Sequence, residues 1–545
     1  MVKYNYLRFS SSQKFNSMIL KIKNKINFIL QQRIVKKQLK LLFSKYKLNK
    51  SKDKSIIIFA GIGYMYLSPF EILLYHLLRK KGYKVKYLIY NKEIKANEVI
   101  TKSVNDLIGK DKFWIRSVNK AIKLLNTSNV EYEFIEYHDD IIAKIGLNLP
   151  EDIETLLSFT FDGINFGKIV EGCLFRYYKS LTFGSDVYTV ALNNLKVSLS
   201  NYIYIKSIHE NEQFDSILMS HGIYTTWEPV VEFCRMNKID FVCYDRAKTK
   251  NHININVNQS SPNWDFSDAW NRYKNRNLSS DENLKVNNYL KERELQKGDV
   301  YSYNFSQKES NIDTLKNRLN IRLDKKIITI FTNLIWDAAN VSRDIAFKNP
   351  LECIIKTILH YQENDSVQIV IRSHPAEKVL GTKERYGDLI SAYFDNKLPN
   401  NVTIIEPEDN VNSFSVIEMS DIGVVNTSTV GLEFAIEAKP ILLISETNYR
   451  NKGFTFDIKN EIDYFQTLDS QLKNIYLKEE QVVLAKKYFF MMMFLYQKKV
   501  PVLYESGIFS GYEYNSLDEI LNDVTIQNIL NTIEKIDSKT DFIKW

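Results

Sequence analysis

Three hydroxyl residues in a row, Thr427-Ser428-Thr429, stand between an apolar run and a helical pattern in the last third of the sequence. Hydroxyls and unpaired backbone N–H groups at the start of a helix bind anions such as phosphate. Glu433 follows one turn later, where it could reach the ribose of a nucleotide. The simpler interpretation is that Ser428 or Thr429 caps the helix and Glu433 completes a capping box. Both interpretations use the same helix terminus, so they are compatible.

A basic pair and a proline follow another apolar run. Arg372 ends the run that begins at 367, and His374 and Pro375 come directly after it. Because the carboxyl ends of parallel strands meet at one edge of a sheet, we expect these side chains near the hydroxyl residues. There Arg372 and His374 would neutralise the charge of a departing phosphate. The sequence holds no Walker lysine, DxD pair or HExxH helix, so a metal-dependent or P-loop mechanism gains no support.

The elements that must position these residues alternate regularly between 326 and 444. Apolar runs typical of buried parallel strands lie at 326–332, 367–372, 402–405, 421–425 and 439–444, and helical patterns lie at 350–361 and 413–419. Such alternation predicts a doubly wound parallel sheet.

The first half of the chain repeats this alternation. Strands are expected at 55–60, 84–90, 215–220 and 240–244, and helices at 69–81 and 226–236. Gly61-Ile62-Gly63 follows the first strand and resembles half of a dinucleotide fingerprint. The third glycine and the acid at the end of the second strand are missing, so NAD binding is weakly supported.

Two residues of the first half are candidates for a catalytic base. His221 leaves the strand at 215–220, at the edge where ligands bind, and could take a proton or bind a hydroxyl. The alternative is a histidine that caps the next helix. Asp162 precedes Gly163 and could act as a general base, or it could be an ordinary turn residue or helix cap.

Composition limits the class of protein. The chain has 545 residues, too many for a single core, so two domains are expected. It is 44% hydrophobic and 25% charged, which excludes global disorder. The four cysteines form no CxxC pair, which argues against a zinc ribbon or a disulfide scaffold.

Positive charge is concentrated at the start of the sequence. Residues 1–54 carry fifteen Lys and Arg residues and one acid, which is a net charge of +14. The whole chain has a net charge of +8, so the remainder has a net charge of −6. Apolar residues recur there at helical spacing between lysines, which is typical of a helix on an anionic membrane surface. Packing on the acidic remainder of the chain and nucleic-acid binding are the alternatives, the last without a supporting motif. No apolar run is long enough to span a bilayer.

The motifs together resemble those of a known family. They are Arg372-Ser373-His374-Pro375-Ala376-Glu377, the stretch from Thr427 to Glu433, Lys439-Pro440, and Tyr449 with Gly453-Phe454. This pattern looks like that of bacterial capsule polysaccharide biosynthesis proteins, which include the Kdo-transferases that prime capsule chains on a lipid. His221-Gly222-Ile223-Tyr224 resembles the motif in the first domain of that family. The resemblance covers 215–457 by residues and the rest by architecture.

The two α/β units resemble the GT-B architecture of nucleotide-sugar glycosyltransferases, which implies a GT-B-like α/β fold with two doubly wound parallel-sheet domains facing one crevice. The charge pattern adds a basic N-terminal helical arm. The expected division is an arm at 1–54, an acceptor domain at 55–310, a nucleotide-donor domain at 311–475, and a helical segment at 476–545 that returns to the first domain.

The His-Pro and Ser/Thr motifs are also similar to those of bacterial sialyltransferases, which bind CMP-sugars. This similarity implies that His374 contacts the phosphate or ribose of CMP and that Ser428 and Thr429 contact the phosphate. Sialyltransferases place their base in a motif of two acids and a glycine, whereas here Phe161 precedes Asp162. The identity of the base therefore stays open, and a UDP-sugar donor stays open beside CMP.

The expected function is that of a metal-independent glycosyltransferase without a cofactor, since the nucleotide-sugar is a substrate. It would move a sugar, from a CMP-sugar by preference, to a growing or lipid-linked surface or capsule polysaccharide. We expect it in the cytoplasm, at the inner face of the plasma membrane. The alternatives are a teichoic-acid-type polyol-phosphate transferase that uses a CDP-polyol, and a non-catalytic capsule-assembly protein.

Overall fold

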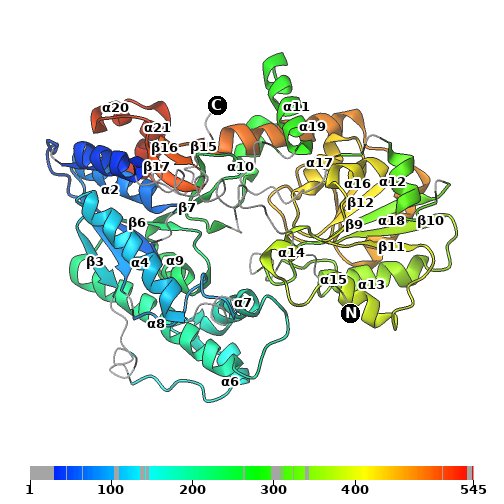
Figure 1. Ribbon diagram of the computed structural model, residues 1–545, viewed down its shortest axis with the longest axis horizontal. Helices are drawn as coiled ribbons and strands as arrows, with labels where there is room; N and C mark the ends of the chain where they lie inside the picture. Colours follow the sequence, from blue (N-terminus) through cyan, green and yellow to red (C-terminus); the bar gives the residue numbers. More distant parts are fainter. Residues whose placement is uncertain are drawn as a thin grey trace, which may run out of the picture.

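Two separate, largely parallel sheets form the framework of the chain in the computed structural model (Figure 1). The structure describes residues 30–536 and 543, with gaps at 45, 64–65, 92, 103–109, 136–141, 143–145, 262–263, 296, 298–307, 310, 323, 338–342 and 506. Residues 1–29 of the predicted arm, and most of the predicted junction between the domains, therefore lie outside the described residues.

The first sheet has seven strands. In their order across the sheet they are β15 (Lys498–Lys499), β8 (His252–Val257), β7 (Asp240–Arg246), β6 (Ser216–Ser220), β1 (Ser55–Gly61), β2 (Lys84–Tyr90) and β3 (Tyr132–Ile135). The strands from β7 to β3 are parallel, and β8 and β15 are added antiparallel at one edge. The four strands predicted in the first half are confirmed.

The second sheet has six strands and is parallel throughout. Its order is β11 (Val402–Ile405), β10 (Val367–Arg372), β9 (Lys326–Phe331), β12 (Ile422–Val425), β13 (Ile441–Leu443) and β14 (Phe456–Asp457). The two sheets together confirm the predicted fold class of two α/β domains.

Helices connect the strands of both sheets. Around the first sheet they are α2 (Ser68–Lys80), α4 (Lys110–Thr127), α6 (Ile153–Leu157), α7 (Phe166–Tyr178), α8 (Val187–Glu212) and α9 (Tyr224–Asn237), with a small hairpin of β4 (Thr160–Phe161) and β5 (Ile164–Asn165) before α7. Beside the second sheet they are α10 (Ser267–Tyr273), α11 (Ser280–Glu294), α12 (Ile312–Arg318), α13 (Pro350–Tyr361), α14 (Ala376–Leu380), α15 (Tyr386–Tyr393), α16 (Ser413–Met419), α17 (Val430–Ile436), α18 (Glu461–Lys473) and α19 (Glu479–Phe490).

Apolar side chains lie on both faces of each sheet, as the continuous apolar runs predict. In β1, Ile56 and Ile58 belong to one buried cluster, while Ile57 and Phe59 belong to the cluster on the opposite face. This alternation follows from the two-residue period of a strand. Because helices cover both faces, every position of such a strand must be apolar.

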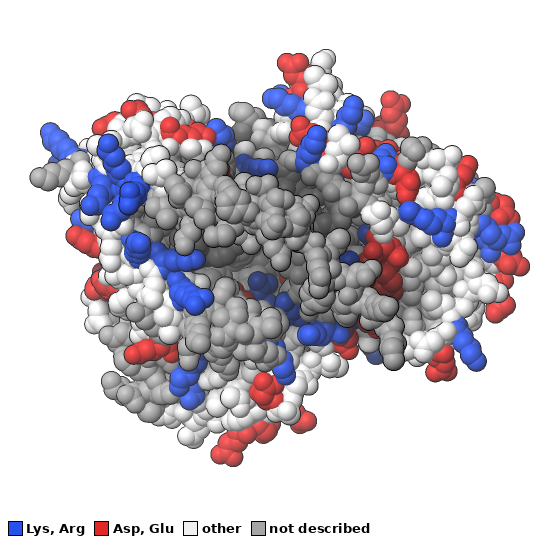
Figure 2. Space-filling view, viewed as in Figure 1, with Lys and Arg blue, Asp and Glu red and all other residues white. Residues whose placement is uncertain are grey.

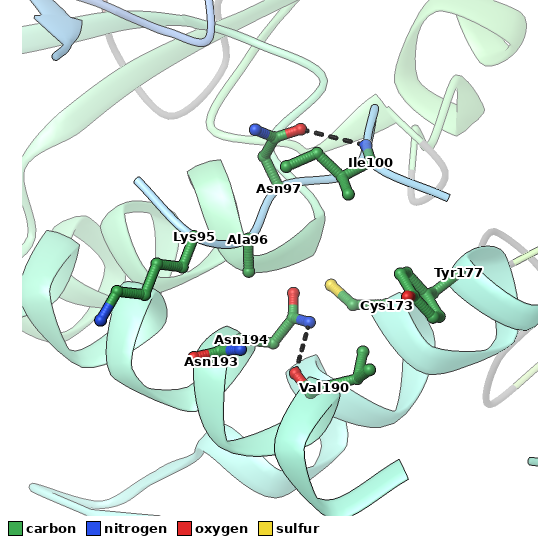
Figure 3. Close-up of a pocket in the computed structure, with 9 residues that line it drawn as sticks. All are labelled: Lys95, Ala96, Asn97, Ile100, Cys173, Tyr177, Val190, Asn193 and Asn194. Atoms are coloured by element: carbon green, nitrogen blue, oxygen red, sulfur yellow. Dashed lines mark hydrogen bonds between the residues drawn. The ribbon is translucent and has the colours of Figure 1, made fainter. Parts of the chain in front are cut away.

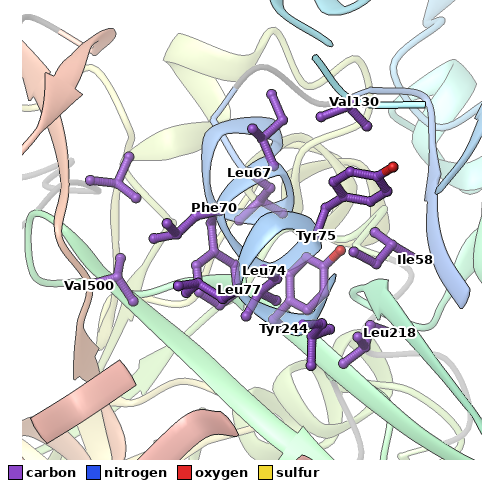
Figure 4. Close-up of a cluster of buried hydrophobic side chains, with 14 of the residues drawn as sticks. Ile58, Leu67, Phe70, Leu74, Tyr75, Leu77, Val130, Leu218, Tyr244 and Val500 are labelled. Atoms are coloured by element: carbon purple, nitrogen blue, oxygen red, sulfur yellow. The ribbon is translucent and has the colours of Figure 1, made fainter. Parts of the chain in front are cut away.

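The end of the chain returns to the first domain. A π-helix (Met491–Tyr496) follows α19 and leads into β15, and then come a hairpin of β16 (Val502–Glu505) and β17 (Ile508–Tyr512), α20 (Leu517–Leu521) and α21 (Val524–Glu534). Val500 from this segment lies with Phe70 and Leu74 of α2 in the core of the first domain (Figure 4). The segment therefore completes that core.

The packing places the division between the domains earlier than the predicted residue 310. Trp264, Trp270 and Tyr289 are buried in one cluster with Ile327 and Phe434 of the second domain. Residues from about 264 onward, including α10 and α11, thus belong to the second core. At the other end, α19 packs in the second domain before the chain crosses back.

A helix at 30–43 represents the predicted arm within the described residues. Its buried side chains, Val35, Leu39, Leu42 and Phe43, pack into the core of the first domain. Gln38 donates to the backbone carbonyl of Tyr512 at 2.9 Å. This part of the arm therefore packs on its own chain through one face. Among helices of the described residues, none is long and apolar enough to cross a membrane.

Candidate functional site

The residues Thr427, Ser428 and Thr429 form the turn between β12 and α17, and their side chains are half-buried. Asn333, which follows the neighbouring strand β9, donates from Nδ2 to the Thr427 hydroxyl at 2.8 Å. The Ser428 hydroxyl accepts the backbone N–H of Val430 at 3.3 Å. Thr429 stands at the N-cap position without a side-chain capping bond. The turn thus keeps its hydroxyls at the carboxyl edge of the sheet.

A lysine of the first domain contacts this turn of the second domain. Lys248 lies just beyond the end of β7, and its Nζ donates to the Thr429 hydroxyl at 2.7 Å. An ammonium group beside hydroxyls and a helix N-terminus is an arrangement that binds anions. The sequence analysis missed Lys248, because nothing local marks a lysine whose partner lies 181 positions later.

His374 lies at the exit of β10, the strand next to β9. Its backbone N–H donates to the Thr332 hydroxyl at 3.1 Å, and its Nδ1 accepts the backbone N–H of Ala376 at 3.1 Å. Pro375 is the N-cap residue of α14. Burial, and then the charges of Arg372 and Lys248, lower the pKa of His374 to about 4.

His374 is therefore neutral at physiological pH, with its proton on Nε2, because Nδ1 already accepts a hydrogen bond. It can offer a hydrogen bond to a phosphate or ribose oxygen. A neutral ring does not carry the positive charge that the sequence analysis expected of His374, and Lys248 brings a cation to this edge.

Arg372 supports the site from behind. Its guanidinium is buried and donates to the backbone carbonyls of Glu406 at 2.9 Å and Val411 at 3.0 Å. Burial lowers its pKa to about 10. The guanidinium therefore fastens the loop after β11, and a contact of Arg372 with a phosphate stays a prediction.

The side chain of Glu433 is buried and contacts α11. Its side chain is 5% exposed and forms an ion pair with Arg293 at the end of α11. The start of α17 has no side-chain capping bond, and a contact of Glu433 with a ribose stays a prediction. Arg293 is the partner that the sequence could not identify.

Asp162 occupies the turn of the β4–β5 hairpin with φ of 48°. Its carboxylate accepts hydrogen bonds from Tyr202 at 2.9 Å and from Lys206 at 2.8 Å, both on α8. The bond from Lys206, against the opposing effect of burial, lowers its pKa. Asn165, not Asp162, caps α7. Among the described residues, Asp162 makes no contact with the other predicted site residues. Its role as a base stays a prediction.

His221 leaves β6 with φ of 48° and faces the crevice edge of the first sheet. Its Nε2 lies 2.9 Å from Oδ1 of Asp245, its Nδ1 contacts the Ser220 hydroxyl, and its ring stacks on Trp227 with 5.3 Å between centroids. The N-cap residue of α9 is Ile223, so His221 does not cap that helix.

Charged and aromatic side chains lie near His221, and the sequence analysis gave Arg176 and Glu98 no role. Arg176 donates from Nε to the carbonyl of Glu98 at 2.8 Å, and its guanidinium lies 5.2 Å from the ring centroid of Tyr224. Glu98 accepts the Thr226 hydroxyl at 2.6 Å, and burial raises the pKa of its carboxyl. The charge of Asp337, from the second domain, acts on both Arg176 and Tyr224. The two domains therefore approach each other here.

Further contacts join the two domains along the same side. The Ser180 hydroxyl donates to Glu384 at 2.9 Å, and the backbone N–H of Lys383 donates to the carbonyl of Lys179 at 3.0 Å. In the space-filling view, Lys and Arg side chains are visible between the two halves of the molecule, with Asp and Glu side chains beside them (Figure 2).

A small pocket lies inside the first domain, between α7, α8 and the loop after β2. Figure 3 shows its lining, which consists of Lys95, Ala96, Asn97, Ile100, Cys173, Tyr177, Val190, Asn193 and Asn194. Its volume of about 20 Å³ has room for water but not for a nucleotide. The pocket is therefore too small to be a nucleotide site. Among the described residues no group of three or more His, Cys, Asp or Glu side chains could hold a metal ion.

Comparison with known proteins gives likeness of structure only. No protein-family model and no curated protein sequence matches the chain. It is similar to the KpsC beta Kdo 2,4 transferase of Thermosulfurimonas dismutans, with 12% identity over 57% of this chain and 88% of the other and a TM-score of 0.36.

It is also similar to a glycosyltransferase of Rickettsia africae, with 10% identity over 90% of this chain and 100% of the other and a TM-score of 0.27. The UDP-GlcNAc 2-epimerase of Methanocaldococcus jannaschii is 15% identical over 80% of this chain and 98% of the other, with a TM-score of 0.26. Glycosyltransferases and epimerases are thus among the solved structures that are similar to this chain. At these TM-scores the likeness is no evidence of substrate or activity.

Proposed function

We propose that this chain is a glycosyltransferase that takes a sugar from a nucleotide donor and builds a surface or capsule polysaccharide. The observation that carries the proposal is the contact of Lys248 with Thr429. It places a cation of one domain on the hydroxyl turn of the other, at the crevice edge of both sheets. An anion bound there would contact both domains at once.

The chemistry follows from the charges around this point. As the bond between the sugar and the phosphate breaks, negative charge accumulates on the phosphate oxygens. Lys248 and the hydroxyls of Ser428 and Thr429 would stabilise that charge, and His374 would donate a hydrogen bond from Nε2. Such fixed charges and dipoles in a half-buried site contribute a few kcal/mol each, on the order of 2–4. Because Lys248 supplies the positive charge, we propose that the reaction needs no metal ion.

The acceptor would bind against the first domain. There His221 or Asp162 would take the proton of the attacking hydroxyl, and of the two His221 lies at the crevice edge. We favour a CMP-sugar as donor because the His-Pro and Ser/Thr motifs resemble those of CMP-sugar enzymes. A growing or lipid-linked polysaccharide is the acceptor class that the same resemblance implies.

Nucleotide binding tests this proposal most directly. Calorimetric titration with CMP, UDP and CDP should show binding of one of them, and Lys248→Ala should weaken it about tenfold, the effect of losing one charge-assisted hydrogen bond. Lys250→Ala, which removes an exposed lysine two positions away, is the control. Equal affinity of the two variants would overturn the assignment of this site.

A donor screen then separates the two enzymatic alternatives. Turnover of CDP-glycerol, without turnover of any nucleotide-sugar, would show a teichoic-acid-type polyol-phosphate transferase instead. Unchanged capsule in a strain that carries both His374→Ala and Ser428→Ala would favour a non-catalytic assembly protein.

We also propose that the enzyme lies on the inner face of the plasma membrane. The helix at 30–43 supports this with a second apolar line, opposite to its buried face. Leu30, Ile34 and Leu41 fall within about 40° of each other on a helical wheel and are exposed. Exposed Arg33 and Lys37 lie along one side of this line. An exposed apolar line with cations beside it fits the headgroup region of an anionic bilayer.

A further inference from the structure

His221 and Asp245 lie side by side because they leave neighbouring parallel strands. In the pairing of β6 with β7, Ser220 lies opposite Tyr244, so the next residue of each strand continues at the same edge. There Nε2 of His221 and Oδ1 of Asp245 are 2.9 Å apart, which is a hydrogen bond. The sequence analysis identified His221 but not this partner.

Neighbouring groups fix both side chains. The Ser261 hydroxyl donates to Oδ2 of Asp245 at 3.2 Å, and the Ser261 backbone N–H donates to the carbonyl of His221 at 2.6 Å. The backbone N–H of His221 donates to the carbonyl of Tyr244 at 2.9 Å. Stacking on Trp227 then leaves the ring one orientation, in which its side chain is 26% exposed.

The surrounding charges favour one arrangement of protons. Burial, and to a smaller extent the charge of Arg176, act to lower the pKa of His221. The charge and hydrogen bond of Asp245, and then the charge of Glu98, outweigh them, so the pKa is raised. Burial acts to raise the pKa of Asp245, but the charge and hydrogen bond of His221 outweigh it and the pKa is lowered. Asp245 is thus a carboxylate, and Nε2 of His221 carries the proton that it accepts.

We propose that Asp245 is a positioning residue that holds the proton on Nε2 of His221 and so leaves Nδ1 as the proton acceptor of the transfer reaction. This inference rests on the proposed function. The acceptor hydroxyl replaces the Ser220 hydroxyl at Nδ1 and loses its proton there. Its oxygen forms the bond to the anomeric carbon of the sugar, while the bond from that carbon to the nucleotide phosphate breaks and its electron pair leaves with the phosphate.

Nuclear magnetic resonance of the full-length protein without any substrate tests the arrangement of protons. The chain has seven histidines, so the signals of His221 are assigned by their loss in His221→Asn. In the native protein we expect the neutral ring of His221 to carry its proton on Nε2. A neutral ring with its proton on Nδ1 would overturn the proposal, and this measurement needs no variant of Asp245.

Titration of His221 in the Asp245→Asn variant tests whether Asp245 raises the pKa of His221. Removing the carboxylate should lower the pKa of His221 by about one pH unit or more. Asp240→Asn, at the other end of β7 and bonded to Asn258, is the control and should leave the titration of His221 in place. An unmoved titration in Asp245→Asn would overturn the proposal.

Kinetics separate this inference from the proposed function. With a donor that the native protein turns over, kcat/KM should rise with pH through the pKa of His221, and that rise should move to lower pH in Asp245→Asn. Coincident profiles would overturn the positioning role while leaving glycosyl transfer intact. If no donor is turned over, the proposed function fails, and the role of Asp245 in transfer fails with it, whatever the titration shows.

Discussion

Arg293 at the end of α11 forms an ion pair with Glu433 of α17, and both side chains are largely shielded from water. The pair fixes α17, the helix that follows the turn of Thr427, Ser428 and Thr429, to α11. The sequence analysis had assigned α11 to the other domain. The pair therefore acts on the stability of the second domain, and only indirectly on binding.

Loss of one partner of this pair should be costly. Arg293→Met leaves the carboxylate of Glu433 buried without its cation and should lower the free energy of unfolding by about 3–5 kcal/mol. The double variant with Glu433→Met should recover most of this loss, because no charge is left unpaired. Urea denaturation of the four proteins completes the cycle. A double variant as unstable as the sum of the single variants would show that the two groups do not interact.

His374 should bind the donor as a neutral hydrogen-bond donor. Its pKa is lowered to about 4, so the ring stays uncharged above about pH 5. His374→Ala should weaken binding of the preferred nucleotide by about tenfold, and the ratio of the two affinities should be the same at pH 5.5, 6.5 and 7.5. The ratio cancels the effect that titration of the nucleotide itself has on both affinities. A ratio that grows as the pH falls would mean that a charged imidazole does the binding.

Glu71 should make the first domain less stable at higher pH. Its carboxyl lies buried in α2 and accepts hydrogen bonds from Tyr87 and Tyr244, and burial raises its pKa to about 7. The folded state therefore holds a proton that the unfolded state has lost above its ordinary pKa of about 4.5, so stability falls as the pH rises from about 4.5 to 7.

The shift corresponds to roughly 3 kcal/mol. Glu71→Gln should remove this contribution. Between pH 5 and pH 8, the free energy of unfolding of the native protein should therefore fall by about that amount relative to that of the variant. Chemical denaturation at both values gives the difference. A difference independent of pH would show that Glu71 keeps one protonation state throughout.

The exposed apolar line of the helix at 30–43 should govern binding to lipid. Ile34→Asp together with Leu41→Asp should reduce sedimentation with vesicles that contain phosphatidylglycerol, because each change replaces an inserted apolar group by a charge that anionic lipid repels. Leu284→Asp, at an exposed leucine of α11, is the matched control. Undiminished sedimentation of the double variant would show that this face does not touch the bilayer.

Sequence alone was sufficient where the determining pattern is local. The runs Ile56-Ile57-Ile58 and Ile327-Ile328 identify strands that are buried on both faces, and a residue at the exit of such a strand must lie at the ligand edge. The places of His221 and His374 followed from this rule.

What the side chains do there depends on partners far along the chain. Glu433 turns toward Arg293, 140 positions earlier, and Thr429 receives Lys248 from the other domain. In the sequence, Arg372 resembles a phosphate ligand because it is a cation at the end of a strand. Only the folded loop shows that its guanidinium binds backbone carbonyls. No spacing in the sequence encodes such contacts.

The return of residues 498–534 to the first domain determines the order in which the two halves can mature. During synthesis, the strands and helices of the second sheet leave the ribosome before Val500 and the β16–β17 hairpin exist. The core of the second half, apart from Ile543, can thus pack while the first half, begun earlier, still exposes apolar side chains of α2. A protein made in this order depends on its final segment as a closing element, and chaperones that bind exposed apolar surface would meet the first half for longer.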